Sequence, residues 1–139
     1  MSIPVWVLLA FAGWTVLALL ASVGVYRWSR ILAGQASIRE WRADLPQGDE
    51  RYRRAMRAHA NCVENLVVYG AIVVAIVASG VQAAVLDTLA LILIVARVCQ
   101  TLVHVVLEQS EPVAAARFGF FFVQLVCMVA MGAYVALHA

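Results

Sequence analysis

Charged residues are scarce in this sequence, and lysine is absent from it. Only 13% of the 139 residues are charged, whereas 65% are hydrophobic, a composition outside the usual range of soluble domains. Such a balance is typical of a chain whose main solvent is lipid. All ten basic residues are arginines, whose guanidinium groups stay ionised even when partly buried. This choice favours the binding of anions, although the net charge is only +2.

Cysteines are also few, and their spacing excludes two common roles. Cys62, Cys99 and Cys127 form neither a CxxC pair nor a metal-type pattern, so we expect no disulfide framework and no metal site. Their apolar surroundings predict buried packing. The first four residues carry no lysine or arginine, and the apolar run continues to Tyr26, longer than the core of a signal peptide. We therefore expect a retained first helix.

Long hydrophobic stretches predict an all-α integral membrane protein with a four-transmembrane-helix bundle. A crossing needs about 20 apolar residues, so the length allows four helices within a single domain over residues 1–139. The connection between the first two helices is the longest, with a turn at Pro46 to Asp49, and Asp49 or Glu50 can cap the helix that follows. The expected helices run from about Ile3 to Arg30, Glu50 to Ser79, Val81 to Leu107 and Pro112 to Leu137.

The arginines are distributed unevenly along the chain. Eight of the ten lie between Arg27 and Arg57, around the first loop, and none lies near Gly80 in the second connection. The excess of arginine in cytoplasmic loops places the first loop in the cytosol. With four crossings, the third connection is then cytosolic as well, and both termini lie on the other side.

Several polar residues lie inside or close to the expected crossings, where an arginine or acid costs about 3 kcal/mol. At 100° per residue, those of each helix share one face within an arc of about 80° or less. Each stripe lies in the half of its helix nearest the cytosol, so the three can converge at one level. The stripes are Arg54, Arg57, Asn61 and Glu64 with Asn65 beside them on the second helix, Arg97, Gln100 and His104 on the third, and Arg117 and Gln124 on the fourth.

Structural explanations compete with a binding site for these residues. Arg54 and Arg57 can reach lipid headgroups, and Glu64 can pair with Arg57 as a structural lock. His59 lies off the stripe and is more typical of a helix contact. Arg117 can also bind headgroup phosphate. The phenylalanines near it, Phe118 and Phe120 to Phe122, can serve packing, lipid contact or the access of a lipophilic substrate.

The segment from Arg54 to Asn65, Arg-Ala-Met-Arg-Ala-His-Ala-Asn-Cys-Val-Glu-Asn, resembles the signature of the membrane-associated proteins in eicosanoid and glutathione metabolism (MAPEG). Its marks are two arginines three residues apart, followed by Asn61 and Glu64 at intervals of four and three. The resemblance covers nearly the whole chain, including the basic first loop, Arg97 in the third helix and an arginine early in the fourth. Among its members, the chain looks most like a bacterial-type microsomal glutathione transferase.

This resemblance implies a homotrimer that binds glutathione between neighbouring subunits, in clefts open to the cytosol. Arg57, Asn61 and Glu64 match glutathione ligands of the family, and Arg97 matches its helix-three arginine. His59 matches a residue that reaches the adjacent subunit's site, and Arg27 or Arg30 can contact a neighbour's carboxylate. Arg54 joins them on the same stripe. Gln100 and His104 stand where eicosanoid members place glutathione-contacting tyrosines. Both can still bind glutathione through hydrogen bonds, but with a different geometry, so the eicosanoid activities are not carried over.

The predicted function is therefore a membrane-bound glutathione transferase, with or without peroxidase activity. Glutathione would be its co-substrate, Glu64 would take the ammonium group, and Arg117 would stabilise the thiolate, as its family counterpart does. The partners would be a lipophilic electrophile or lipid hydroperoxide and membrane lipids, with no nucleic acid. Three alternatives stay open: another thiol, a non-catalytic assembly protein, or a small four-helix exporter. The exporter is disfavoured because the only deep acid, Glu64, lies among arginines that repel cations.

Overall fold

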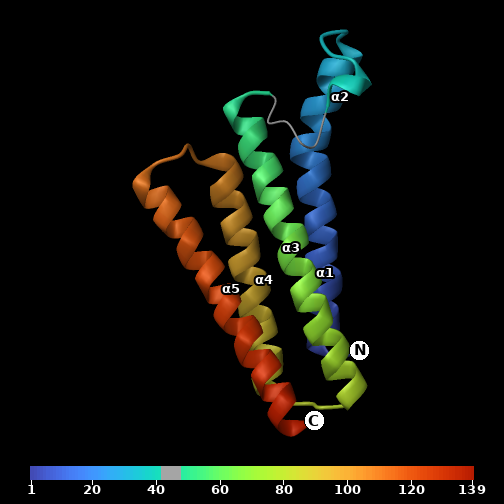
Figure 1. Ribbon diagram of the computed structural model, residues 1–139, viewed down its shortest axis with the longest axis vertical. Coiled ribbons are helices and arrows are strands. Elements are labelled where there is room, and N and C mark those ends of the chain that lie inside the picture. Colours follow the sequence, from blue (N-terminus) through green and yellow to red (C-terminus); the bar gives the residue numbers. More distant parts are fainter. Residues whose placement is uncertain (42–47) are drawn as a thin grey trace.

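The computed structural model describes residues 1–41 and 48–139, and its regular structure is entirely helical in these ranges. The elements are α1 (Ile3–Ala18), the π-helix η1 (Leu19–Gly24), α2 (Val25–Leu32), the 3-10 turn η2 (Ile38–Glu40), α3 (Glu50–Ser79), α4 (Ala84–Val106) and α5 (Glu111–His138). The segments α1, η1 and α2 form one continuous rod (Figure 1). The rod and the three long helices are each long and apolar enough to cross a membrane, which confirms the expected multi-pass class.

The observed helix ends largely match the expected ones, with two corrections. The first helix continues to Leu32 rather than ending at Arg30, and α4 begins at Ala84 rather than at Val81. Gly80 ends α3 in the left-handed conformation, with φ of 70°, and the next three residues are non-helical until Ala83 caps α4. Asp49 caps α3 as predicted, since its carboxylate accepts from the Tyr52 N–H at 2.7 Å. Pro46 and Gln47 of the predicted turn lie outside the described residues.

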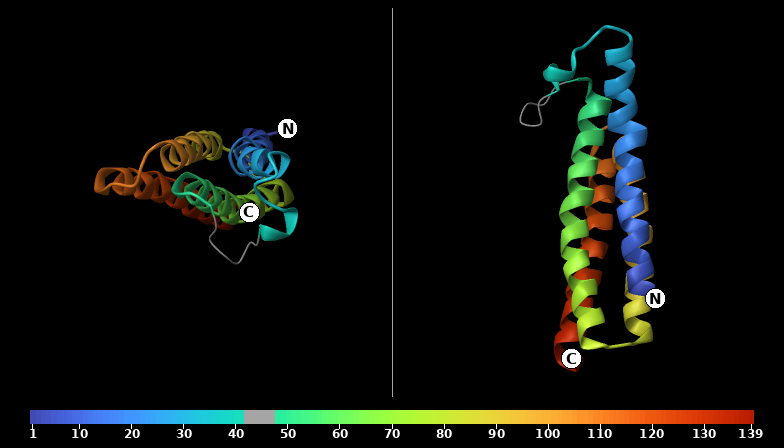
Figure 2. Two further views of the ribbon diagram at one scale, coloured as in Figure 1. Left: turned by 90° about the horizontal axis from the view of Figure 1, so that it is seen from above. Right: turned by 90° about the vertical axis from the view of Figure 1, so that its right-hand side faces the viewer.

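The helices run antiparallel, so their connections fall at two ends of the bundle. Both termini and the Gly80 connection lie at one end, here called the termini end (Figure 1). The connection after α2 and the α4–α5 connection lie at the other, here called the loop end. Seen from above, α3 and α4 occupy the middle, and the first helix and α5 flank them on opposite sides (Figure 2).

An apolar core holds the helices together, mainly toward the termini end. The Tyr69 hydroxyl donates to the Pro4 carbonyl at 3.0 Å and ties α3 to the start of α1. Because lipid tails are as apolar as these side chains, close packing rather than burial from water stabilises this region. The buried members of the core include Val7, Phe11, Tyr69, Val73, Ile76, Leu86, Ala90, Leu93, Met131 and Val135. Cys62 and Cys127 are buried beside them and Cys99 is half-buried, as packing predicts.

Candidate functional site

Polar side chains from three helices meet at a cavity of about 310 Å³ in the loop half of the bundle. There α5 diverges from α3 toward the loop end (Figure 1). The cavity has polar and aromatic walls, formed by Asn61, Gln100, His104, Ala114, Arg117, Phe118 and Phe121. Four of the sequence-predicted site residues, Asn61, Gln100, His104 and Arg117, are therefore brought together across α3, α4 and α5.

Asn61 has its amide orientation set by two neighbours. Its Oδ1 accepts from Arg97 Nη1 at 3.1 Å and from Asn65 Nδ2 at 3.0 Å. A guanidinium only donates, so the amide oxygen must face Arg97, and both lone pairs of that oxygen are in use. The amide NH₂ of Asn61 is then the group available to the cavity. This residue can donate hydrogen bonds to a carboxylate, carbonyl or thiolate.

Arg97 lies behind Asn61 rather than in the cavity wall. It is only 1% exposed, and its guanidinium carbon lies 5.3 Å from the Phe11 ring centre, within cation–π range. Its Nε and Nη2 make no hydrogen bond within the described part of the chain, and no carboxylate there pairs with it. The sequence predicted a direct glutathione contact, whereas this geometry lets Arg97 act on the cavity through Asn61.

Gln100 and Gln124 fasten α5 to α4 at the floor of the cavity. Gln100 Nε2 donates to the Arg117 carbonyl at 3.2 Å, and Gln124 Nε2 donates to Gln100 Oε1 at 3.0 Å. Gln124 is 1% exposed, so this chain of bonds is buried between the two helices. It fixes the position of the Arg117 backbone on α5 relative to α4. Gln100 still has one amide hydrogen and one lone pair free for a ligand.

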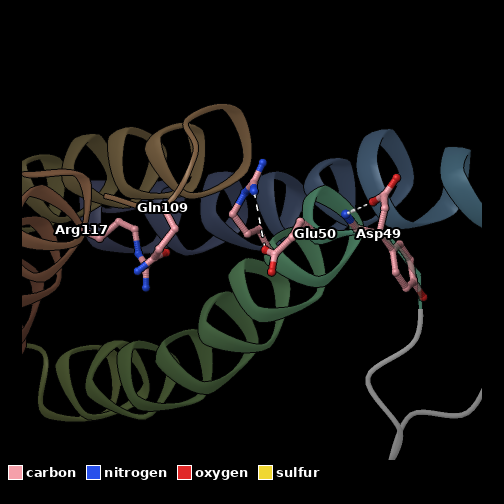
Figure 3. Close-up of polar contacts among 6 residues, drawn as sticks. Asp49, Glu50, Gln109 and Arg117 are labelled. Atoms are coloured by element: carbon pink, nitrogen blue, oxygen red, sulfur yellow. Dashed lines mark hydrogen bonds and ion pairs between the residues drawn. The ribbon is translucent and has the colours of Figure 1, made fainter. Parts of the chain in front are cut away.

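Arg117 is half-buried, and it projects toward the α4–α5 connection. Its Nη1 donates to Gln109 Oε1 at 2.7 Å (Figure 3), and the residue lines the cavity together with His104. The His104 Nε2 is buried and has no hydrogen-bond partner in the described ranges. The cavity thus presents an arginine, an amide donor and an unpartnered imidazole, without a carboxylate in its wall, and this set suits an anionic or acceptor-rich ligand.

The other predicted residues do not line this cavity in the single chain. Arg54 is 8% exposed and its Nη1 lies 3.9 Å from Glu50, an exposed acid near the start of α3 (Figure 3). Arg57 and Glu64 are exposed on α3 and form no ion pair with each other, so the structural lock between them is absent. In the single chain these two residues therefore lie on the outer surface of α3.

His59 and Arg30 are also not among the residues that line the cavity. His59 is half-buried, and its Nδ1 has no hydrogen-bond partner among the residues that the structure describes. Arg30 lies in α2, where its Nη1 donates to the Tyr26 hydroxyl at 3.2 Å and its guanidinium carbon is 5.5 Å from that ring centre. In one chain, Arg30 is therefore part of an aromatic cluster at the loop end and does not line the cavity.

Two contributors to the site have no clear signal in the sequence. Gln109 binds Arg117, but a glutamine in a short connection looks like any loop residue. Phe11 supports Arg97 from the first helix, where it is one apolar residue among many. Both contacts join residues of different helices or of a helix and a loop, so periodicity within one helix does not reveal them.

The comparisons with known proteins agree with this architecture. Residues 4–137, nearly the whole chain, match the model of the MAPEG family. No curated protein and no solved structure matched the chain. The match to the family model, together with four apolar helices that carry the polar site between them, shows that the chain belongs to the MAPEG family.

Proposed function

We propose that this protein is a membrane-bound glutathione transferase whose site is the cavity between α3, α4 and α5. The observation that carries the proposal is the convergence of Asn61, Gln100, His104 and Arg117 on one cavity, whose wall has no carboxylate among the residues that the structure describes. Membership of the MAPEG family supports glutathione chemistry at the level of the family. The second substrate in this proposal is a lipophilic electrophile, for which the exposed Phe118 offers an apolar surface beside the cavity.

The charges of glutathione suit the residues around this cavity. The tripeptide has two carboxylates, one ammonium group and one thiol, and arginines bind carboxylates through paired hydrogen bonds. Asn61 and Arg117 face the ligand as donors, and Arg57 and Glu64 lie on the outer surface of α3. An exposed carboxylate at membrane depth is costly, so we include in the proposal a homotrimer in which a neighbouring chain covers Glu64 and the tripeptide's ammonium pairs with it.

The proposed chemistry begins with the thiol. Arg117 stabilises the thiolate because a fixed cation attracts a sulfur anion more strongly in a partly dry site than it would in water, where the attraction is screened. The sulfur then forms a bond to the electrophilic carbon, and the leaving group departs with the bonding electron pair. With a lipid hydroperoxide, the thiolate instead attacks the terminal oxygen, the O–O bond breaks, and the lipid alkoxide takes up a proton and leaves as the alcohol. A second glutathione then converts the sulfenic acid to the disulfide and water.

A thermal-shift experiment tests ligand binding directly. The purified protein is heated in detergent with glutathione, with an S-alkyl glutathione, or with a neutral tripeptide of similar size. A ligand that binds only the folded state raises the melting temperature, so both glutathione compounds should raise it and the neutral peptide should not. Product analysis with an aromatic halide and with a hydroperoxide then separates transferase from peroxidase activity. Equal shifts for all three peptides would favour a non-catalytic assembly protein.

The membrane orientation is part of the same proposal. The arginines that cluster at the loop end favour a cytosolic loop end in a bacterial inner membrane, where glutathione is available to the cavity. Cysteine labelling from outside intact cells should miss a reporter at Ser37 and reach one placed after Ala139. The opposite labelling pattern would put the cavity on the wrong side of the membrane.

A further inference from the structure

A second cavity lies on the opposite side of the α3–α4 pair from the site above. Its volume is about 320 Å³, and no residue of α5 lines it. On α4, Val105 lines this second cavity and the preceding residue, His104, lines the first. The walls come from the first helix, the start of α3 and α4: Ala21, Ser22, Val25, Tyr26, Ser29, Asp49, Arg51, Tyr52, Ala55 and Val105.

The π-helical turn of the first helix forms one wall of this cavity. The Val25 N–H bonds to the Leu20 carbonyl, five residues back, and the Ser22 hydroxyl bonds to the Ala18 carbonyl. A π turn inserts an extra residue and is less stable than a regular α turn, and such turns are frequent at functional sites. Ala21 and Ser22 belong to the turn and have small side chains, so the cavity keeps its volume beside them.

The walls change from apolar to polar toward the loop end. Along the first helix and α3, Ala21, Val25 and Ala55 line the part farther from the loop, and Val105 of α4 adds a further apolar side chain to the wall. Ser29, Asp49 and Arg51 line the part nearer the loop. The Asp49 carboxylate already accepts the Tyr52 N–H, whereas the side chain of Arg51 is exposed at the cavity. A cation at the polar mouth of an apolar interior is complementary to an anionic amphiphile.

An aromatic wall closes the side of the cavity and is itself held by an arginine. Tyr26 and Tyr52 stack with ring centres 4.5 Å apart, and Arg27 Nε donates to the Tyr52 hydroxyl at 2.5 Å. These contacts join α2 to the start of α3 and hold the two tyrosines of this wall in place. Positive charge from Arg27 adds to that of Arg51 at this end, where anionic headgroups are attracted to basic residues.

We propose that this cavity is a binding site for a single-chain anionic amphiphile. Its carboxylate or phosphate would lie at Arg51, and its hydrocarbon chain would lie along Ala21, Val25 and Ala55. The volume is at the lower end of the range of small-molecule sites, about 300 to 1,000 Å³, which suits one chain rather than a two-chain lipid. The site is separate from the cavity that contains Arg117, and the inference does not depend on glutathione binding there.

Equilibrium binding of laurate tests the site in the intact protein. The protein is embedded in phosphatidylcholine nanodiscs, and uptake by empty nanodiscs is subtracted. Arg51→Gln should weaken laurate binding about fivefold, the upper range for one exposed charge contact. Arg53→Gln is the matched control, because it removes the same charge two residues away from an exposed position outside the cavity wall, and it should leave binding unchanged.

Two further arms examine the chain and the headgroup. Ala55→Phe fills the apolar part and should weaken laurate binding at least tenfold, while Arg51→Gln keeps the test valid if that buried variant does not fold. Dodecyltrimethylammonium, with the same chain length and the opposite charge, should not bind. Comparing laurate with lauroyl lysophosphatidate distinguishes a fatty acid from a phospholipid product as the better ligand. Equal losses in Arg51→Gln and Arg53→Gln, equal binding of the cationic amphiphile, or full laurate binding by folded Ala55→Phe would overturn the proposal.

Discussion

The two halves of the α3–α4 pair differ in how their buried groups are satisfied. Toward the termini end, Tyr69, Leu86 and Leu93 pack in an apolar core, and the buried Tyr69 hydroxyl has a carbonyl partner. Toward the loop end, Arg97, His104 and Gln124 are buried with side-chain nitrogen or oxygen atoms that have no hydrogen-bond partner in the described ranges. The same helices therefore form a closed core in one half and an incompletely satisfied polar region in the other.

This difference separates stability from ligand binding along one pair of helices. An unpartnered buried polar group costs about 1 to 3 kcal/mol, and that cost is recovered when a ligand supplies the missing partner. In the apolar half the buried Tyr69 hydroxyl has its partner, and the packing there stabilises the fold enough to offset the unpartnered groups of the loop half. We therefore expect substitutions in the loop half to change binding and chemistry, and those in the termini half to change folding.

The largest effect is expected for Glu64→Gln. This change keeps the side-chain shape but removes the proposed counter-charge of the glutathione ammonium, and loss of a charged partner in a binding site costs about 2 to 5 kcal/mol of affinity. Calorimetric titration of the purified variant measures the change. Glu111→Gln, at an exposed acid at the start of α5, is the control. Undiminished glutathione affinity in folded Glu64→Gln would remove this residue from the site.

Leu93→Ala should produce the opposite pattern. Leu93 is 1% exposed in the apolar core, and its truncation should reduce stability by about 2 kcal/mol, the low end for core leucines because lipid weakens the apolar driving force. The melting temperature in detergent should fall while glutathione affinity of the folded protein stays the same. Leu91→Ala, at a half-exposed position on the same helix, should leave both unchanged. A loss of affinity without a loss of stability would break the division between the halves.

Arg97→Met tests whether Arg97 acts through Asn61. Without the guanidinium, only Asn65 holds the Asn61 amide, so its NH₂ is no longer fixed toward the cavity, and glutathione affinity should fall about tenfold. Stability should be unchanged or higher, because an unpaired buried charge is removed. Arg97→Lys should restore part of the affinity. Lower stability together with normal affinity would make Arg97 a structural residue alone.

A smaller effect is expected for Arg117→Leu, and it concerns chemistry rather than binding. A free thiol has a pKa of about 8.5. Loss of the nearby cation should raise the pKa of the thiol of bound glutathione by about half a pH unit, so that about threefold less thiolate is present at neutral pH. Turnover should fall accordingly, while glutathione affinity is largely retained. The thiolate absorbance near about 240 nm follows the titration.

The control for Arg117→Leu is Arg53→Leu, at an exposed arginine away from the cavity. Arg53→Leu should leave the thiolate titration in place. A normal titration in Arg117→Leu would remove this arginine from thiolate stabilisation and assign it to headgroup phosphate.

The smallest effect is expected at the exposed turn beyond the loop end. The backbone N–H and hydroxyl of Ser37 donate to Glu40 at 3.1 and 3.0 Å, and together with Arg39 they hold the pKa of Glu40 below its usual value. A lowered carboxyl pKa means that this contribution is present above about pH 4.3 and is lost as the pH falls through the folded-state pKa. In the native protein, amide hydrogen exchange at Ser37 should become faster as the pH falls through that pKa. In Glu40→Gln it should be fast at every pH, and glutathione affinity should be the same in both proteins.

Much of the architecture was predictable, because membrane helices carry their own signals. The long apolar runs located all four crossings, and Asp49 marked the start of α3. The residue offsets also placed Asn61, Gln100, His104 and Arg117 on faces that meet. The π turn at Leu19–Gly24 was not predicted, since its sequence is as apolar as that of the α-helix on either side.

The polar stripe of α3 was predicted as one unit, but the structure divides it. Arg54 and Asn65 face inward, Asn61 lines the cavity, and Arg57 and Glu64 face outward. A stripe of about 80° is wide enough to span the boundary between a neighbouring helix and the outer surface. Helical angles give relative directions around one axis, and they do not state where the next helix lies.

The sequence by itself determined that the chain lies in a membrane, how many times it crosses and which residue types form the site. An apolar run long enough to cross lipid and an arginine within such a run are both local properties of the sequence. The tertiary structure alone decided that Arg97 bonds to Asn61 and packs over Phe11 instead of lining the cavity, and that Gln109 holds Arg117. It also decided that two cavities lie on opposite sides of the α3–α4 pair. The physical reason is that contacts between helices depend on their rotation, depth and divergence, which the packing of all the side chains sets together.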